Sequence, residues 1–261
     1  MKLAIVIPAY NEERRIGTTL SAYTEFFDDL SNTGVLDYKI LIVINNTKDN
    51  TEGIVQSFMK RNKNISYLNL AEGGKGYAIV KGFGQALKES HDLIGFVDAD
   101  MATGPEYFYS LVKELELYDC AIANRYIPGS KIIPRFTFRR IVVSRIFNMF
   151  VRAMFLIPNT DTQCGAKLFK REAISEVLPE LWMTNWAIDV EILYKLRGKG
   201  FSIREVTTVW YEMPGSNIDM VGDSIRMLFA IIQLRLIHSP FRGPIRFIRP
   251  IISRLYHYMM K

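Results

Sequence analysis

Residues 92–106 read DLIGFVDADMATGPE, an apolar run that ends in two aspartates. Residues 93–97 have the composition of a strand that is covered on both faces, and Asp98 and Asp100 follow it directly. Side chains two apart on a strand point to the same side, so both carboxylates would face one spot. Like charges at that separation repel unless a cation lies between them. The stretch therefore predicts either a solvated strand end or a cation site.

The rest of the first half alternates between runs of this kind and amphipathic helices. Runs rich in Ile, Leu and Val begin near residues 2, 38, 65, 92 and 120, and helical patterns occupy 12–30, 49–61, 75–89 and 105–118. This alternation predicts an α/β fold with a mainly parallel central sheet, and a further strand is expected within 202–212. Polar residues follow four strand ends in a row, which is where open α/β sheets bind ligands.

Two common nucleotide-binding motifs are excluded. The first strand runs into PAYNEE without the glycines of a dinucleotide-binding GxGxxG, and EGGKGYA has Gly76 where a phosphate-binding loop needs Ser or Thr. The chain has only Cys120 and Cys164, which indicates neither a disulfide framework nor a zinc site and fits a reducing compartment. We expect no signal peptide, and because the sequence has no run of about 18 apolar residues, we expect no spanning helix.

The net charge of +6 is concentrated in two segments. Residues 131–160 contain six basic side chains and 224–261 contain seven, with no acid in either segment. Arginines alternate there with large apolar residues, as in helices that lie in a membrane interface. Nucleic acid is the competing partner of a basic protein, but no polar basic stripe is present, so a membrane surface is favoured.

Several motifs together resemble a known family. IPAYNEE (7–13), DNT (49–51), GGKG (73–76) and VDAD (97–100) resemble inverting glycosyltransferases of the GT-A fold. DTQCGAKLF (161–169), NWAIDVEILY (185–194) and WYEMPGSN (210–217) resemble the dolichyl-phosphate β-glucosyltransferase branch, to which dolichyl-phosphate mannose synthases are closely related.

The resemblance implies a Rossmann-like GT-A (nucleotide-diphospho-sugar transferase) fold with membrane-associated amphipathic helices. We expect a catalytic domain over 1–218, with an amphipathic interface and acceptor helix at 131–157 inside it. Residues 219–261 are expected to form basic amphipathic helices that lie on the membrane.

The resemblance also assigns the donor side of the site. Asp98 and Asp100 are expected to hold Mg²⁺ or Mn²⁺ at the diphosphate of a nucleotide-diphosphate sugar, and Asp100 thereby to act in catalysis. The alternative is a solvated strand end with Thr103 capping the next helix. Lys75, between two glycines, is expected near the donor, where the alternative is a solvated turn lysine.

Nucleotide recognition is expected at the first two strand ends. Pro8, Tyr10 and Glu12 match the nucleotide-binding loop of the family. Asn45 stands where relatives usually have an aspartate, and its amide suits uracil better than guanine. Alternatively, Asn45 and Asn46 only shape the turn.

Acceptor recognition is expected from basic and polar residues of the second half. Arg125, Arg140 and Ser144 match residues that hold a lipid phosphate in the family, although Arg140 could equally face lipid headgroups without specificity. Asp161 is expected to be catalytic, either as a base or by orienting an arginine or the sugar, because an anionic phosphate needs no base. Asp189 is a further catalytic candidate.

The resemblance thus implies transfer of a hexose to a polyprenyl (dolichyl-type) phosphate with inversion. UDP-glucose is the expected donor, and a dolichyl-phosphate mannose synthase that uses GDP-mannose is the alternative. The expected location is the cytoplasmic face of a membrane, as a peripheral protein without a spanning helix. A non-catalytic nucleotide-sugar-binding partner in a membrane glycosylation assembly is the alternative from another class.

Overall fold

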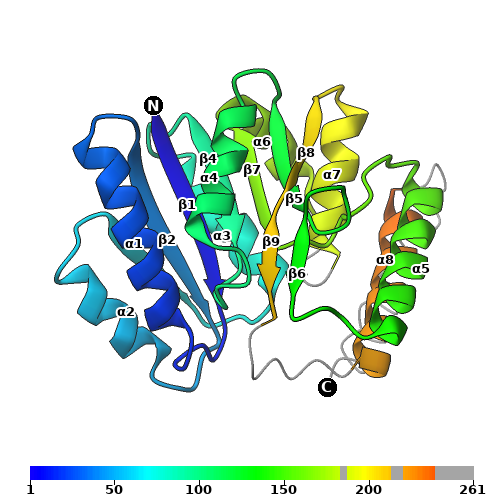
Figure 1. Ribbon diagram of the computed structural model, residues 1–261, viewed down its shortest axis with the longest axis horizontal. Coiled ribbons are helices and arrows are strands. Elements are labelled where there is room, and N and C mark those ends of the chain that lie inside the picture. Colours follow the sequence, from blue (N-terminus) through cyan, green and yellow to red (C-terminus); the bar gives the residue numbers. More distant parts are fainter. Residues whose placement is uncertain (183–186, 213–219, 239–261) are drawn as a thin grey trace.

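The computed structural model describes residues 1–182, 187–212 and 220–238, and a seven-stranded sheet organises them (Figure 1). The order across the sheet is β3-β2-β1-β4-β7-β5-β8. Its strands, in chain order, are β1 (Lys2–Ala9), β2 (Asp37–Asn45), β3 (Ile65–Leu70), β4 (Leu93–Val97), β5 (Cys120–Asn124), β7 (Ala166–Lys170) and β8 (Ile203–Thr207).

Parallel pairing joins β3, β2, β1 and β4, and also joins β5 and β8. The predicted α/β class with a mainly parallel sheet is thus confirmed. One strand differs: β7 lies antiparallel between β4 and β5. β7 was not among the predicted strands, because AKLFK is short and contains Lys167, which is fully buried.

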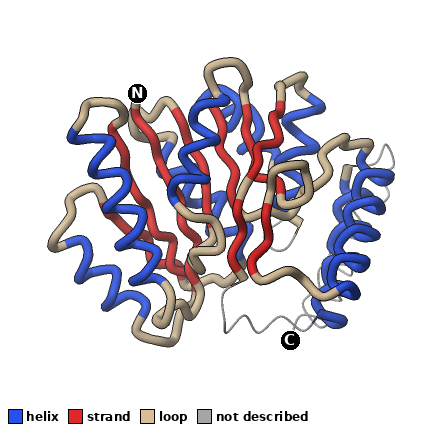
Figure 2. Tube along the Cα trace, in the orientation of Figure 1, coloured by secondary structure: helices blue, strands red, loops and turns tan. Residues whose placement is uncertain are grey.

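Helices cover both faces of the sheet (Figure 2). One apolar core joins the sheet to α1, α2 and α4, and a second core joins it to α3, α6 and α7. The stripe of Ile16, Leu20, Tyr23 and Phe27 on α1 is fully buried, as the helical period requires. These helices are α1 (Ile16–Asn32), α2 (Thr51–Met59), α3 (Lys75–Ala86), α4 (Pro105–Glu114), α6 (Arg171–Val177) and α7 (Ile188–Gly198).

Helices α5 (Phe138–Phe155) and α8 (Met220–Ile237) lie side by side at the right of Figure 1. A third apolar core, which includes Val151, Phe155, Ile231 and Leu234, packs them together and against α7. Within the described part of the chain, no helix is both long enough and apolar enough to cross a membrane.

The predicted domain division stays a prediction. Its boundary at 218 falls within residues 213–219, and the basic tail after 238 also lies outside the described residues. The expected strand in 202–212 is in fact two strands: β8 belongs to the main sheet, and β9 (Val209–Tyr211) pairs in parallel with β6 (Lys131–Ile133).

Candidate active site

The carboxyl ends of β1, β2 and β4 meet where the strand order reverses. β1 lies between β2 and β4, and the chain passes from β1 to β2 on one side and returns to β4 on the other. Ligands of open α/β sheets bind at such a point. Asn11, Asn46 and Met101 follow these strands with positive φ angles of 53°, 48° and 63°. Because non-glycine residues in this conformation cluster at functional sites, the backbone also marks this edge.

Asp98 directly follows β4, and its carboxylate occupies space that a glycine leaves open. The backbone N–H of Asp98 donates to the carbonyl of Gly165 over 3.1 Å, which extends the pairing of β4 with β7. A Cβ atom on Gly165 would lie 1.8 Å from Oδ2 of Asp98. The other oxygen, Oδ1, lies 2.6 Å from Nζ of Lys75. The glycine of the DTQCG motif is therefore what accommodates the Asp98 side chain.

Asp100 and Glu12 place further negative charge beside Asp98. Burial raises the pKa of Asp100, and the charge of Asp98 raises it further. Burial also raises the pKa of Glu12, with smaller contributions from Asp100 and Asp98, although Arg15 opposes this shift. Arg15 donates to both carboxylate oxygens of Glu12 over 2.7 Å. A bound cation would relieve this mutual repulsion of carboxylates.

The aspartate pair offers the donor chemistry of a divalent-metal site. Mg²⁺ in phosphate-binding sites is usually held by one or two carboxylates, with water and substrate phosphates as the other ligands. Across the described ranges, no three His, Cys, Asp or Glu side chains form a metal-binding group. The residues present therefore fit a cation whose coordination shell is completed by a bound diphosphate, and not a cation that is coordinated by protein side chains alone.

Lys75 provides a positive charge beside the aspartates. It begins α3, and the preceding Gly74 has a φ of 129°, a conformation that favours glycine. Burial would lower the pKa of Lys75, but the Asp98 carboxylate, with a contribution from Asp189, raises it overall. Lys75 therefore stays protonated at neutral pH.

Pro8, Tyr10 and Asn45 occupy the first two strand ends. Pro8 is buried in β1, whereas Tyr10 is 52% exposed. The buried Asn45 amide donates to the carbonyl of Ala9 over 3.1 Å and accepts from the backbone N–H of Gly74 over 3.2 Å. Asn45 thus connects β1, β2 and the loop before α3, and its contact with a base stays a prediction.

Asp189 and Glu191 are both buried on α7 but contact different partners. Asp189 forms an ion pair with Lys167 of β7 and raises the pKa of Lys75, which places its charge near the aspartate pair. Oε1 of Glu191 lies 2.9 Å from Nε2 of His238, which follows α8. The two carboxylates diverge, as expected for residues two apart on a helix.

Arg125 and Asp161 form a bidentate ion pair between the end of β5 and the loop before β7. The guanidinium donates to the two carboxylate oxygens over 2.8 and 2.9 Å, and the backbone N–H of Arg125 donates to Oδ2 over 3.0 Å. Burial would raise the pKa of Asp161, but Arg125 holds it below its usual value. This geometry fits an orienting role for Asp161 better than that of a base, because both oxygens already accept hydrogen bonds.

The other two predicted acceptor residues lie one turn apart on α5. Arg140 forms an ion pair with Glu212, and its guanidinium lies 4.0 Å from the centre of the Phe136 ring. Ser144 shares a 2.5 Å hydrogen bond with the Tyr126 hydroxyl. Both side chains therefore point back from α5 toward the segments that carry β6 and β9.

Three rings, Tyr126, Phe136 and Trp210, connect these residues and are called the aromatic cluster below. The Arg125 guanidinium lies 5.4 Å from the Tyr126 ring centre and 5.6 Å from that of Trp210. The Trp210 and Phe136 rings are 5.2 Å apart. Arg125 and Arg140, which are distant in sequence, thus flank one cluster.

Sequence reasoning missed residues that support the site from neighbouring elements: Thr19, Tyr23, Gly165, Lys167 and Glu212. Gly165 and Glu212 lie in motifs quoted above, but their contacts depend on tertiary pairing. Two hydroxyl side chains four apart in the apolar stripe of α1 are the one local signal that could have drawn attention to Thr19 and Tyr23.

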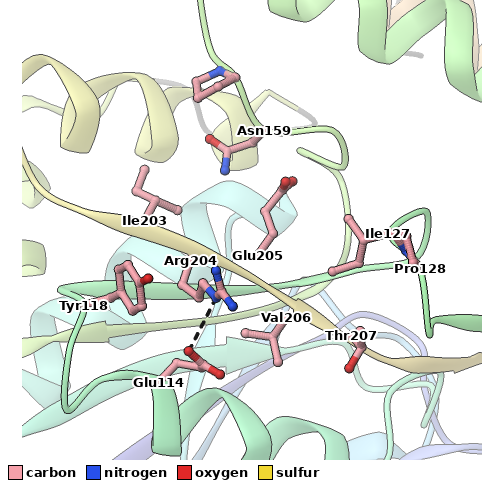
Figure 3. Close-up of a pocket in the computed structure, with 11 residues that line it drawn as sticks. Glu114, Tyr118, Ile127, Pro128, Asn159, Ile203, Arg204, Glu205, Val206 and Thr207 are labelled. Atoms are coloured by element: carbon pink, nitrogen blue, oxygen red, sulfur yellow. Dashed lines mark ion pairs between the residues drawn. The ribbon is translucent and has the colours of Figure 1, made fainter.

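A groove of about 580 Å³ runs along the edge strand β8 (Figure 3). Glu205 in this groove accepts hydrogen bonds from Asn124 over 2.7 Å and from the backbone N–H of Thr160 over 2.6 Å. It therefore supports the loop of Asp161 from the outer side of the sheet. The lining residues are Glu114, Tyr118, Ile127, Pro128, Pro158, Asn159 and Ile203–Thr207.

Residues 4–178 match the sequence profile of glycosyl transferase family 2, over more than half of the chain. The chain belongs to glycosyl transferase family 2. Similar proteins include the dolichyl-phosphate β-glucosyltransferase of Dictyostelium discoideum, which is 32% identical over 243 residues, spanning 89% of this chain and 73% of the relative. The enzyme of that name from Homo sapiens is 27% identical, over 90% of this chain and 75% of the relative. The predicted family and branch are confirmed.

Solved structures of similar fold include those of one bacterial enzyme. Glucosyl-3-phosphoglycerate synthase from Mycobacterium tuberculosis, in complex with UDP, is 16% identical with a TM-score of 0.68, over 92% of this chain and 82% of that one. The same enzyme in complex with Mn²⁺, UDP and phosphoglyceric acid has a TM-score of 0.67, over 92% and 80% of the two chains. At this identity the likeness concerns the fold, and the predicted GT-A fold is confirmed.

Proposed function

We propose that this protein is a metal-dependent inverting glycosyltransferase that moves glucose from UDP-glucose to dolichyl phosphate, giving dolichyl β-D-glucosyl phosphate. The observation that carries the proposal is that two groups of side chains lie next to β9. The loop of Asp98 and Asp100 bonds to its backbone, and Arg125 and Arg140 flank the aromatic cluster that includes its Trp210. Relatives named dolichyl-phosphate β-glucosyltransferase, at 27–32% identity, support dolichyl phosphate as the acceptor and glucose as the transferred sugar.

On the donor side, Asp98 and Asp100 would hold Mg²⁺ or Mn²⁺, which offsets negative charge on the departing diphosphate when bound. Lys75 adds a second positive charge at the same place. Pro8, Tyr10, Glu12 and Asn45 are proposed to line the nucleotide pocket. Asp189 acts through its charge near Lys75 and positions that group.

On the acceptor side, Arg125 and Arg140 bind the phosphate of the lipid, with Ser144 as a hydrogen-bond donor. An oxygen of this phosphate attacks the anomeric carbon from the face opposite the diphosphate. The new C–O bond forms as the bond to the UDP oxygen breaks, which inverts the anomeric centre and releases UDP. The phosphate is anionic near neutral pH, so Asp161 has no proton to remove and instead orients Arg125.

The acceptor reaches the site from a membrane surface, on the proposed cytoplasmic face, to which the protein attaches peripherally. The exposed face of α5 combines apolar and basic side chains, the composition that suits a headgroup boundary. Each basic side chain near an anionic surface contributes about 1 kcal/mol. The exposed residues of α5 include Phe138 (81% exposed), Arg139, Arg145, Ile146, Met149 and Arg152.

The test uses the purified chain with dolichyl phosphate in liposomes and labelled UDP-glucose or GDP-mannose, with and without chelator. We expect glucosyl lipid that disappears with EDTA and returns with Mn²⁺ or Mg²⁺. The Asp100→Ala variant should fold and make no product, and full activity in that variant would end the metal assignment. Product with GDP-mannose but not with UDP-glucose would overturn the assignment of UDP-glucose as the donor. Nucleotide-sugar binding without turnover would favour the non-catalytic partner.

A further inference from the structure

The loop that carries the two aspartates has an uncommon backbone conformation. Met101, directly after Asp100, has a φ of 63°. Residues with a Cβ atom rarely adopt this left-handed backbone conformation, and they keep it only where the surrounding structure imposes it. The Asp100 carboxylate accepts from the backbone N–H of Ala102 over 3.0 Å, so the shape of the loop and the direction of this carboxylate are linked.

Two side chains of α1 hold the same loop from behind. The Thr19 hydroxyl donates to the carbonyl of Ala99 over 2.7 Å, and the Tyr23 hydroxyl donates to the carbonyl of Thr103 over 2.9 Å. Both side chains are fully buried and lie one helical turn apart. Ala99 separates the two aspartates, so these bonds fix the loop between the carboxylates and at its far end.

Strand β9 also holds the loop. The backbone N–H of Tyr211 donates to the carbonyl of Ala102 over 2.8 Å, and Thr103 forms an isolated bridge with Trp210. The carbonyls of Ala99, Ala102 and Thr103 thus each accept a hydrogen bond from a different element or turn. Removing one of the two hydrogen bonds from α1 would release the loop at one carbonyl, while its contacts with β9 remain.

We propose that Thr19 and Tyr23 are positioning residues that set the geometry of the aspartate pair for its cation. This inference rests on the proposed function, in which Asp98 and Asp100 hold the metal. Mg²⁺ demands near-ideal ligand geometry at short distances, so a carboxylate pair on an unanchored loop binds it less well. Partners behind the ligands of metal sites typically change metal affinity by about 10- to 100-fold when removed.

A purely structural role predicts a different result, and the chain offers a matched control. Tyr23 and Tyr38 both contact the Phe27 ring, with ring centres 6.0 and 5.6 Å from it. The Tyr38 hydroxyl, however, donates to Asp28 over 2.5 Å, at the amino end of β2, away from the aspartate loop. Replacing either tyrosine by phenylalanine removes one buried hydroxyl from the same aromatic group.

The experiment measures Mn²⁺ binding to the full chain with saturating UDP, by the loss of the free-ion electron paramagnetic resonance signal. Variants are Tyr23→Phe, Thr19→Val, the conservative Thr19→Ser and the control Tyr38→Phe, each checked by urea unfolding. We expect the Mn²⁺ Kd to rise about tenfold in Tyr23→Phe and Thr19→Val. In Thr19→Ser and Tyr38→Phe it should stay within about twofold of wild type, while the KM for dolichyl phosphate is unchanged in all four.

The outcomes separate this inference from the proposed function. Wild-type protein that binds Mn²⁺, with an equal Kd in Tyr23→Phe and Thr19→Val, overturns the positioning role alone. An equal rise in Kd in the Tyr38→Phe control also overturns it, because general destabilisation then explains the effect. Wild-type protein that binds no Mn²⁺ with UDP overturns the metal assignment itself.

Discussion

Replacing Gly165 by alanine should disable the donor site while leaving the fold intact. The new Cβ atom would lie 1.8 Å from Oδ2 and 2.3 Å from Cγ of Asp98. Non-bonded atoms normally stay about 3.5 Å apart, so the Asp98 carboxylate must move by roughly 1.7 Å. The φ of Gly165 lies outside the left-handed range, so alanine suits the backbone. The atoms in the way are the end of a one-third-exposed side chain, which turns aside at low cost.

The expected effect on catalysis is large because a displaced Asp98 carboxylate could no longer reach the proposed metal ion. A misplacement of about 1 Å at a reacting centre costs on the order of 100-fold in rate. We therefore expect kcat/KM for UDP-glucose to fall about 100-fold in Gly165→Ala, equivalent to about 2.7 kcal/mol. The free energy of unfolding in urea should change by less than about 1 kcal/mol, because no cavity forms and the Asp98–Lys75 ion pair that is disturbed is one-third exposed.

The assay compares initial rates at varied UDP-glucose and Mn²⁺ with a fixed, saturating level of lipid phosphate. The matched control is Gly84→Ala on α3, where a Cβ atom meets nothing within 4 Å. That variant should gain up to about 1 kcal/mol of stability and keep its activity. The reasoning is refuted if Gly165→Ala folds and keeps the wild-type kcat/KM and Mn²⁺ dependence.

Three further outcomes follow from the same contacts. Asp161→Asn leaves the Arg125 charge buried without its partner, so urea unfolding at pH 7 should show a loss of about 3–5 kcal/mol. Because Arg125 lowers the folded-state pKa of Asp161, the difference in unfolding free energy between wild type and Asp161→Asn should shrink as the pH falls from 5 toward that pKa. A difference that stays constant with pH would contradict the ion pair. Burial raises the pKa of the Cys120 thiol, and it raises the pKa of the Cys164 thiol to about 12. Neither thiol should therefore react with a disulfide reagent at pH 8 until urea is added. Rapid labelling of the native protein would show that the two thiols are not buried. Trp210→Leu should raise the KM for dolichyl phosphate about fivefold, because the cation–π contact with Arg125 is lost, while the dependence of the rate on Mn²⁺ stays the same. An unchanged KM would exclude a role for the Trp210 ring in acceptor binding.

The parallel half of the fold could be predicted because its strands are buried on both faces. Such strands appear as continuous apolar runs, and β1, β2 and β4 have this composition. β7 breaks the rule, since its Lys167 is buried and satisfied by Asp189 and by the carbonyl of Cys164. A charged residue in a central strand depends on partners from α7 and a loop, and no local pattern indicates them.

The site divides in the same way between local and tertiary information. The spacing of Asp98 and Asp100 is local, and their carboxylates lie close enough for the charge of Asp98 to raise the pKa of Asp100. Asn45 also follows a strand, yet its amide bonds to the backbone of two neighbouring segments. Composition at a strand end cannot distinguish a ligand-facing amide from one that joins loops, because both need the same residue type at the same position.

Strand β9 and the residue after it contact both halves of the proposed site. Its backbone bonds to the aspartate loop through Tyr211, and the next residue, Glu212, donates its N–H to the carbonyl of Ile133 on β6. The Glu212 carboxylate pairs with Arg140. The last residue of β9 and the residue that follows it thus contact the proposed metal-binding loop and a proposed phosphate-binding arginine. In the proposed function, an incoming dianionic phosphate would compete with Glu212 for Arg140, so acceptor binding would rearrange an ion pair one residue away from the contact with the aspartate loop.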